Sequence, residues 1–78
     1  MKYKYADLVA KIQNKMIPEL AEYVSIDMVE ACIRVRANNG SLIDMRQAVM
    51  NVLPPMTPDE GDYVATYVVT GCSLADTL

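Results

Sequence analysis

Residues 54–71 read PPMTPDEGDYVATYVVTG, and the conformation of this stretch decides the fold class of the chain. Its first half carries the signals of a helix start. Thr57 is a residue type that caps helices, Pro58 suits the first helical position, and Glu60 follows Thr57 by three residues, which makes a capping box. These signals predict a helix that begins at Pro58.

The second half of the stretch favours a strand instead. Residues 63–70 are mostly β-branched or aromatic, and such residues have high β-propensity. Propensity is a weak preference, worth tenths of a kcal/mol per residue. A strand here would also need a partner, and no other segment reads as one, so two copies would have to pair across an interface. Because Gly71 is a residue type that ends helices, we expect a helix over residues 58–70.

Three earlier segments also read as helices, near residues 5–23, 26–39 and 42–53. The first has a single apolar stripe at helical spacing. Pro18 interrupts it and predicts either a kink or a new short helix that starts there. Ser25 supplies the N-cap of the second segment.

The second and third segments are joined by a tight connection. Gly40 follows Asn38 and Asn39 and is expected to adopt the left-handed conformation that closes a helix. Ser41 then caps the next helix. We therefore expect one all-α domain, a small bundle of about four short helices around a central αα-hairpin.

Two of these helices have unusually wide apolar arcs. The arc of residues 42–53 spans about 220°, and that of residues 26–37 is similarly wide, against the 100° or somewhat more that a surface helix needs. The apolar content, 53%, also exceeds the usual range of about 45–50%. We expect another chain to cover the surplus, and a two-fold homodimer is predicted, with basic residues 1–15 near acidic residues 54–78 of the second copy.

Composition excludes several classes of function. The chain has 78 residues, a net charge of −3 and no histidine, and it shows no nucleophile beside a base and no phosphate-binding glycine loop. We expect no catalysis, no cofactor and no metal. Residues 1–15 lack a signal peptide's apolar run, and no stretch is long enough to span a membrane, so a soluble cytoplasmic protein is expected. Cys32 and Cys72 are expected to be reduced, buried and structural.

Six side chains are the candidate partner-binding residues. Arginines within an apolar arc must either extend to water or meet a partner, methionine gives an adaptable apolar surface, and tyrosines four residues apart share a helix face. The tyrosines would be either interface anchors or core residues with the hydroxyl at the rim. The six are Arg36, Ile43, Arg46, Met50, Tyr63 and Tyr67.

Two other constellations have alternative interpretations. Asp59, Glu60 and Asp62 could bind a cation or imitate phosphate toward a basic partner, but helix capping and the helix dipole already explain all three. The helix after Gly40-Ser41 is superficially like a helix-turn-helix recognition helix, with three potential base-reading residues. They are Arg46, Gln47 and Asn51. The net negative charge and the apolar width of this helix make DNA binding the alternative rather than the preferred function.

The preferred prediction is a non-catalytic protein-binding module. A surplus of apolar, methionine-rich surface on a chain without chemical apparatus indicates a small inhibitor or regulatory adaptor that acts on a larger protein. In size and character the chain is similar to phage-encoded inhibitors of bacterial proteins and to small regulatory subunits.

Overall fold

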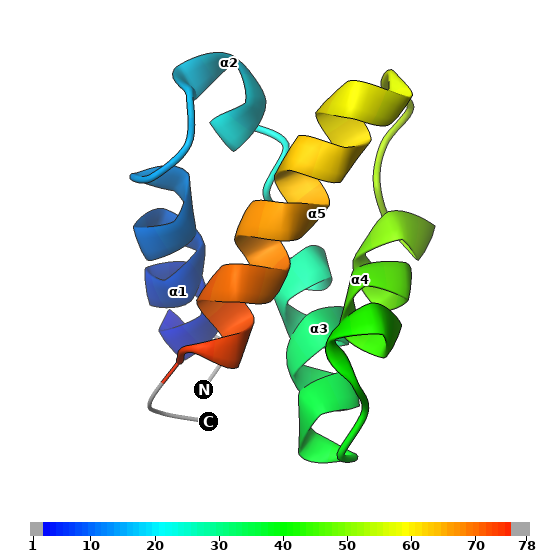
Figure 1. The fold of residues 1–78 in the computed structure, drawn as a ribbon. Helices are drawn as coiled ribbons and strands as arrows, with labels where there is room; N and C mark the ends of the chain where they lie inside the picture. The colour runs from blue at the N-terminus through cyan, green and yellow to red at the C-terminus, as the bar shows by residue number, and fades with distance from the viewer. Residues whose placement is uncertain (1–2, 76–78) are drawn as a thin grey trace.

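Residues Pro58–Ser73 form a helix, and the fold is all-α. The computed structural model describes residues 3–75, and these contain five helices and no strand (Figure 1). The helices are α1 (Tyr3–Gln13), α2 (Pro18–Ala21), α3 (Ile26–Ala37), α4 (Leu42–Asn51) and α5 (Pro58–Ser73). The prediction of a small helical bundle is confirmed, and the strand alternative for residues 63–70 is wrong.

Helix α5 begins as predicted but ends later. The Glu60 backbone N–H donates to Thr57 Oγ1 at 3.2 Å, and the Thr57 N–H donates to Glu60 Oε1 at 3.0 Å, so both halves of the capping box are present. The expected end at residue 70 is wrong, because α5 continues through Gly71 to Ser73. Gly71 serves a close approach instead. A Cβ on it would lie 2.4 Å from Cγ1 of Ile12 in α1.

The first predicted segment, residues 5–23, divides at the proline. α1 ends at Gln13, and α2 begins with Pro18 as its first residue, which is one of the two predicted outcomes. Two hydrogen bonds fix the connection between α1 and α2. Gln13 Nε2 donates to the carbonyl of Ala21 at 2.9 Å, and the Ile17 N–H donates to the hydroxyl of Tyr63 in α5 at 2.9 Å. The second of these fixes the start of α2 against the middle of the last helix.

The αα-hairpin of α3 and α4 is present, but a different residue closes α3. Asn39 has φ 63°, whereas no described glycine has positive φ, so the left-handed role predicted for Gly40 is wrong. The Asn39 N–H donates to the carbonyl of Arg36 at 3.0 Å, and the Gly40 N–H donates to that of Val35 at 2.9 Å. This pair of bonds is a Schellman motif with Asn39 at the left-handed position.

The N-caps of α3 and α4 lie where the sequence placed them. Ser25 Oγ accepts the N–H of Met28 at 3.3 Å. Ser41 and Asp44 form a second reciprocal capping box, with bonds of 3.2 and 3.1 Å. α3 and α4 each end two residues before the predicted boundaries of 39 and 53, because the last residues of each belong to its C-terminal turn.

Helix α3 is the centre of the bundle. It contacts α1, α4 and α5 (Figure 1), and its buried side chains come from both sides of its wide apolar arc. They are Met28, Val29, Cys32 and Ile33. Among the large apolar residues of α3, only Ile26 is exposed. The chain itself therefore covers most of the surplus arc on α3, and the surplus that remains lies on α4.

The described residues pack around one hydrophobic core. The radius of gyration is 11.2 Å, close to the value of about 11.5 Å expected for a compact chain of this length. Within residues 3–75, none of the helices combines the length and apolarity needed to cross a membrane.

Candidate functional site

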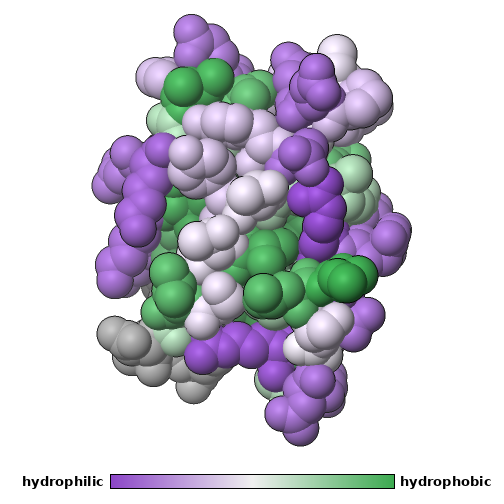
Figure 2. Space-filling view, viewed as in Figure 1, coloured by the Kyte–Doolittle hydropathy of each residue, from purple (hydrophilic) through white to green (hydrophobic). Residues whose placement is uncertain are grey.

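The exposed apolar side chains of the bundle are unevenly distributed. The three most exposed large ones are Ile43 at 79%, Leu74 at 70% and Leu42 at 60%. Leu42 and Ile43 begin α4, and Leu74 is the C-cap of α5. In the view of Figure 2, hydrophobic surface gathers around the C-terminal half of α5, and hydrophilic residues flank it on both sides.

Two grooves run along α5 and share one ridge. The α1–α5 groove encloses about 580 Å³, and the α4–α5 groove encloses about 220 Å³. The exposed residues Thr66 and Thr70 line both. We call the ridge and its apolar borders the α5 face, which consists of Leu42, Ile43, Thr66, Val69, Thr70 and Leu74.

Tertiary packing creates this face. Because Gly71 lacks a side chain, Ile12 of α1 sits directly against α5, and the two helices form the floor of the larger groove. On the other side, Val69 lies at the bottom of the α4–α5 groove beside Leu42 and Ile43. The result is a ridge of two threonines between two apolar depressions.

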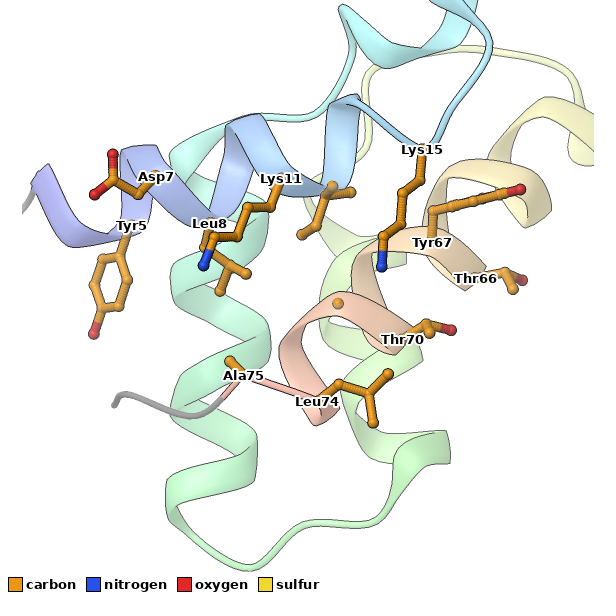
Figure 3. A pocket seen from close by; sticks show the side chains of 12 residues that line it. Tyr5, Asp7, Leu8, Lys11, Lys15, Thr66, Tyr67, Thr70, Leu74 and Ala75 are labelled. Carbon is orange, nitrogen blue, oxygen red and sulfur yellow. The ribbon is translucent and has the colours of Figure 1, made fainter.

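The charges around the face are of two kinds. On the α4 side, Arg46 forms an ion pair with Asp62 and lies 3.5 Å from Thr66 Oγ1. On the α1 side, Lys11 and Lys15 line the larger groove (Figure 3). Neither lysine has an ion pair or side-chain hydrogen bond among the described residues. One flank is therefore neutralised within the chain, and the other presents uncompensated positive charge.

Arg36, the first predicted partner-binding residue, is engaged inside the chain. Its Nη1 donates to the carbonyl of Cys72 at 2.7 Å and to that of Ala75 at 3.0 Å. These carbonyls lie at the C-terminal end of α5, where a helix lacks internal donors and where its dipole favours a cation. The guanidinium of Arg36 thus closes α5 and ties it to α3.

Replacing this guanidinium tests its structural role. Arg36→Met keeps much of the apolar stem but removes both donors, so we expect the free energy of unfolding to fall by about 2 kcal/mol. Arg34→Met is the matched control, since Arg34 makes only an exposed pair with Glu30 at 3.8 Å, and it should change stability by less than about 0.5 kcal/mol. Urea titration followed by circular dichroism measures both. Equal effects of the two substitutions would contradict the capping role.

The other predicted residues on α4 are separated by the structure. Ile43 and Arg46 line the α4–α5 groove. Met50, which is 39% exposed, does not line either groove. Its Cε lies 3.9 Å from the position of a Cβ on Gly61, near the start of α5. Only Ile43 and Arg46 of this trio therefore belong to one candidate site.

The two tyrosines are stacked and half-buried. The ring centroids of Tyr63 and Tyr67 are 4.7 Å apart. The hydroxyl of Tyr63 accepts the N–H of Ile17, whereas Tyr67 lines the α1–α5 groove. A hydrogen bond with Tyr63 raises the pKa of Tyr67. Tyr63 has a role within the fold, and Tyr67 is available at the groove.

The two cysteines lie together in the core. Cys32 of α3 and Cys72 of α5 are both buried free thiols. A hydrogen bond from the Cys72 thiol to Cys32, together with burial, raises the pKa of Cys72, and the same bond lowers the pKa of Cys32. Both thiols are free and buried, as predicted.

The remaining constellations are accounted for locally. Glu60 belongs to the capping box and Asp62 to the ion pair with Arg46, and no group of three potential ligands within residues 3–75 is placed to hold a metal ion. On the proposed DNA-reading helix, Gln47 Nε2 donates to Asn51 Oδ1 at 3.1 Å. The carboxylate of Asp44 occupies the N-terminus of that helix, where a phosphate would approach.

Sequence reasoning missed most of the residues of the face. Leu74 lies beyond the predicted end of α5 at residue 70, and Val69 and Thr70 are not among the predicted partner-binding residues. Lys11 and Lys15 are likewise not among the predicted partner-binding residues. The available signal was the spacing of four residues between Thr66, Thr70 and Leu74, which places them on one helix stripe.

Comparisons of the chain with protein families, with curated proteins and with solved structures found no match. The candidate site therefore rests on its own geometry.

Proposed function

We propose that this chain is a non-catalytic protein-binding module that docks through the α5 face onto a larger protein, as a small inhibitor or regulatory adaptor in the cytoplasm. One observation carries the proposal: the three most exposed large apolar side chains within residues 3–75 border two adjacent grooves, Leu42 and Ile43 the α4–α5 groove and Leu74 the α1–α5 groove. Contiguous exposed apolar surface on a small domain is typical of an interaction site.

The chemistry of the face suits protein recognition. Burying a large apolar side chain contributes roughly 1.5–3 kcal/mol of binding free energy. Three such side chains together contribute as much as the central anchor residues of a typical protein–protein interface. The threonine hydroxyls of the ridge add hydrogen-bonding groups between the apolar borders. The acidity and small size agree with the class of phage-encoded inhibitors to which the sequence is similar in character.

A matched pair of isoleucine substitutions tests this proposal. Ile43 and Ile26 occupy the first turns of α4 and α3, where an aspartate is favoured by the helix dipole, so both aspartate variants should fold. Ile43→Asp should weaken capture of the partner protein from cells that express the chain by about tenfold or more. Ile26→Asp, an equally charged change outside both grooves, should leave capture unchanged. Equal capture by all three proteins would overturn the proposal.

The alternative, a DNA-binding regulator, has a distinct signature. A DNA binder's affinity for random duplex falls steeply as salt concentration rises, because phosphate contacts release counterions. We expect no such binding from a chain with a net charge of −3. Tight, salt-dependent binding to random duplex DNA, measured by fluorescence anisotropy, would favour the alternative.

Self-association remains a prediction, and the exposed apolar surface available for it is smaller than the sequence indicated. The predicted homodimer assumed a surplus apolar arc on both central helices. Of the large apolar side chains of α3, the structure leaves only Ile26 exposed. On α4 and its C-cap, the exposed large apolar side chains are Leu42, Ile43, Met50 and Val52. Sedimentation equilibrium at tens of micromolar shows whether a second copy occupies the face, in which case Ile43→Asp should yield monomer.

A further inference from the structure

The five cationic side chains whose surroundings the structure describes divide into two groups. The three arginines are all engaged within the chain: Arg34 with Glu30, Arg36 with two carbonyls, and Arg46 with Asp62. Lys11 and Lys15 have no such partner among the described residues, and both line the α1–α5 groove. In a chain of net charge −3, this groove is therefore a local positive site.

The lysines stand one turn apart above an apolar floor. The N–H groups of Asn14 and Lys15 continue the helical turn by donating to Ala10 and Ile12, so Lys11 and Lys15 are separated by about 6 Å along the axis. Figure 3 shows both side chains over the opening between α1 and α5, while Asp7, the one carboxylate among the described residues that line the groove, points away. Below them lie apolar groups of Leu8, Ile12, Tyr67 and Leu74.

The shape of the groove selects a helix as its occupant. Both walls of the groove are helices, and their backbone groups are already hydrogen-bonded within each helix. An extended peptide would find no sheet edge to pair with, so its own backbone amides would stay unsatisfied over the apolar floor. A helix satisfies its own backbone. The α5 wall from Thr66 to Leu74 is about 12 Å long, enough for roughly two turns.

We propose that the α1–α5 groove binds an acidic amphipathic helix of the partner protein, with carboxylates four residues apart on Lys11 and Lys15 and an apolar stripe on the floor. This inference rests on the proposed function and specifies the partner's chemistry. Because Thr66 and Thr70 line both grooves, Leu42 and Ile43 lie just across this ridge, and the apolar surface extends beyond what a small amphipathic anion covers.

The test is a titration of the ¹⁵N-labelled full chain with a designed 15-residue helical peptide at low ionic strength. The peptide carries a leucine stripe bordered by glutamates four residues apart, and a peptide of equal composition carries its glutamates on the opposite face. We expect the first peptide to shift the amide resonances of Leu8, Ile12, Thr70 and Leu74, and the second to bind about tenfold more weakly. Affinity should fall as salt is added.

Charge reversal in the protein provides the second arm. Lys11→Glu and Lys15→Glu should each weaken binding of the first peptide by about fivefold. Arg34→Glu makes the same charge change on α3, outside the groove, and should alter affinity by less than about twofold. Leu74→Gln should also weaken binding, because it removes the most exposed apolar group of the floor.

Three results would overturn the inference. Unchanged affinity in both lysine variants would remove the role of charge. If the amide resonances of the groove residues respond to decanoate but not to the peptide, the groove would be assigned to a small anion. A wild-type dimer broken by Leu74→Gln would assign it to a second copy.

If Ile43→Asp loses the cellular partner while the lysine variants retain it, the proposed function stands and only the assignment of this groove is wrong.

Discussion

Gly71→Val is expected to lower the free energy of unfolding by about 3 kcal/mol, one of the two largest effects we predict. A Cβ at this position would lie 2.4 Å from Cγ1 and 2.9 Å from Cδ1 of Ile12. Ile12 is itself buried and β-branched, so its side chain has little rotational freedom within α1. α1 would have to move away from α5. A domain of 78 residues has roughly 4–12 kcal/mol of stability in total, so the loss is a large fraction.

The same helix contains a control with the opposite expected sign. A Cβ on Gly61 would meet only side-chain atoms at 3.4 Å or more, which is ordinary van der Waals contact. Gly61→Ala should therefore raise the free energy of unfolding by up to about 1 kcal/mol, since alanine favours the helix. Gly71→Ala should lower it despite the same gain in propensity. Urea denaturation distinguishes the two, and stabilisation by both alanines would show that Ile12 moves aside freely.

Gly40→Val is expected to be nearly as costly, at about 3 kcal/mol. The reason is steric, because Gly40 does not have the positive φ that the sequence suggested. A Cβ there would lie 2.3 Å from Cγ1 and 3.0 Å from the carbonyl oxygen of Val35. That carbonyl is held by the Gly40 N–H in the Schellman motif, so it cannot retreat without breaking the closure of α3.

Asn39→Gly is the matched control for the hairpin. Asn39 holds the left-handed conformation, and glycine adopts it without steric cost. We expect the free energy of unfolding to change by less than about 0.5 kcal/mol, because the relief of steric strain at positive φ offsets the added conformational freedom of the unfolded chain. Thermal unfolding of the two variants settles the assignment. A tolerated Gly40→Val together with a destabilising Asn39→Gly would mean that α3 closes differently.

The candidate site was predictable only in part. Ile43 and Arg46 were identified, because an exposed apolar arc on residues 42–53 is visible on a helical wheel. Arg36 was selected by the same reasoning, yet its guanidinium reaches carbonyls 36 and 39 residues away in the sequence. No periodicity within one helix reveals which distant helix end a long side chain meets.

The sequence by itself determined the all-α fold class and the places where α3, α4 and α5 begin. Caps at Ser25, Ser41 and Thr57 act on backbone groups three residues away, so their effect is local and readable along the chain. Tertiary structure decided where α5 ends and which surface stays open. Gly71 could have stopped the helix, but contact with Ile12 made it a point of close packing, which carried Leu74 onto the face. Helix ends and grooves depend on contacts between segments far apart in sequence, whose energies no local pattern contains.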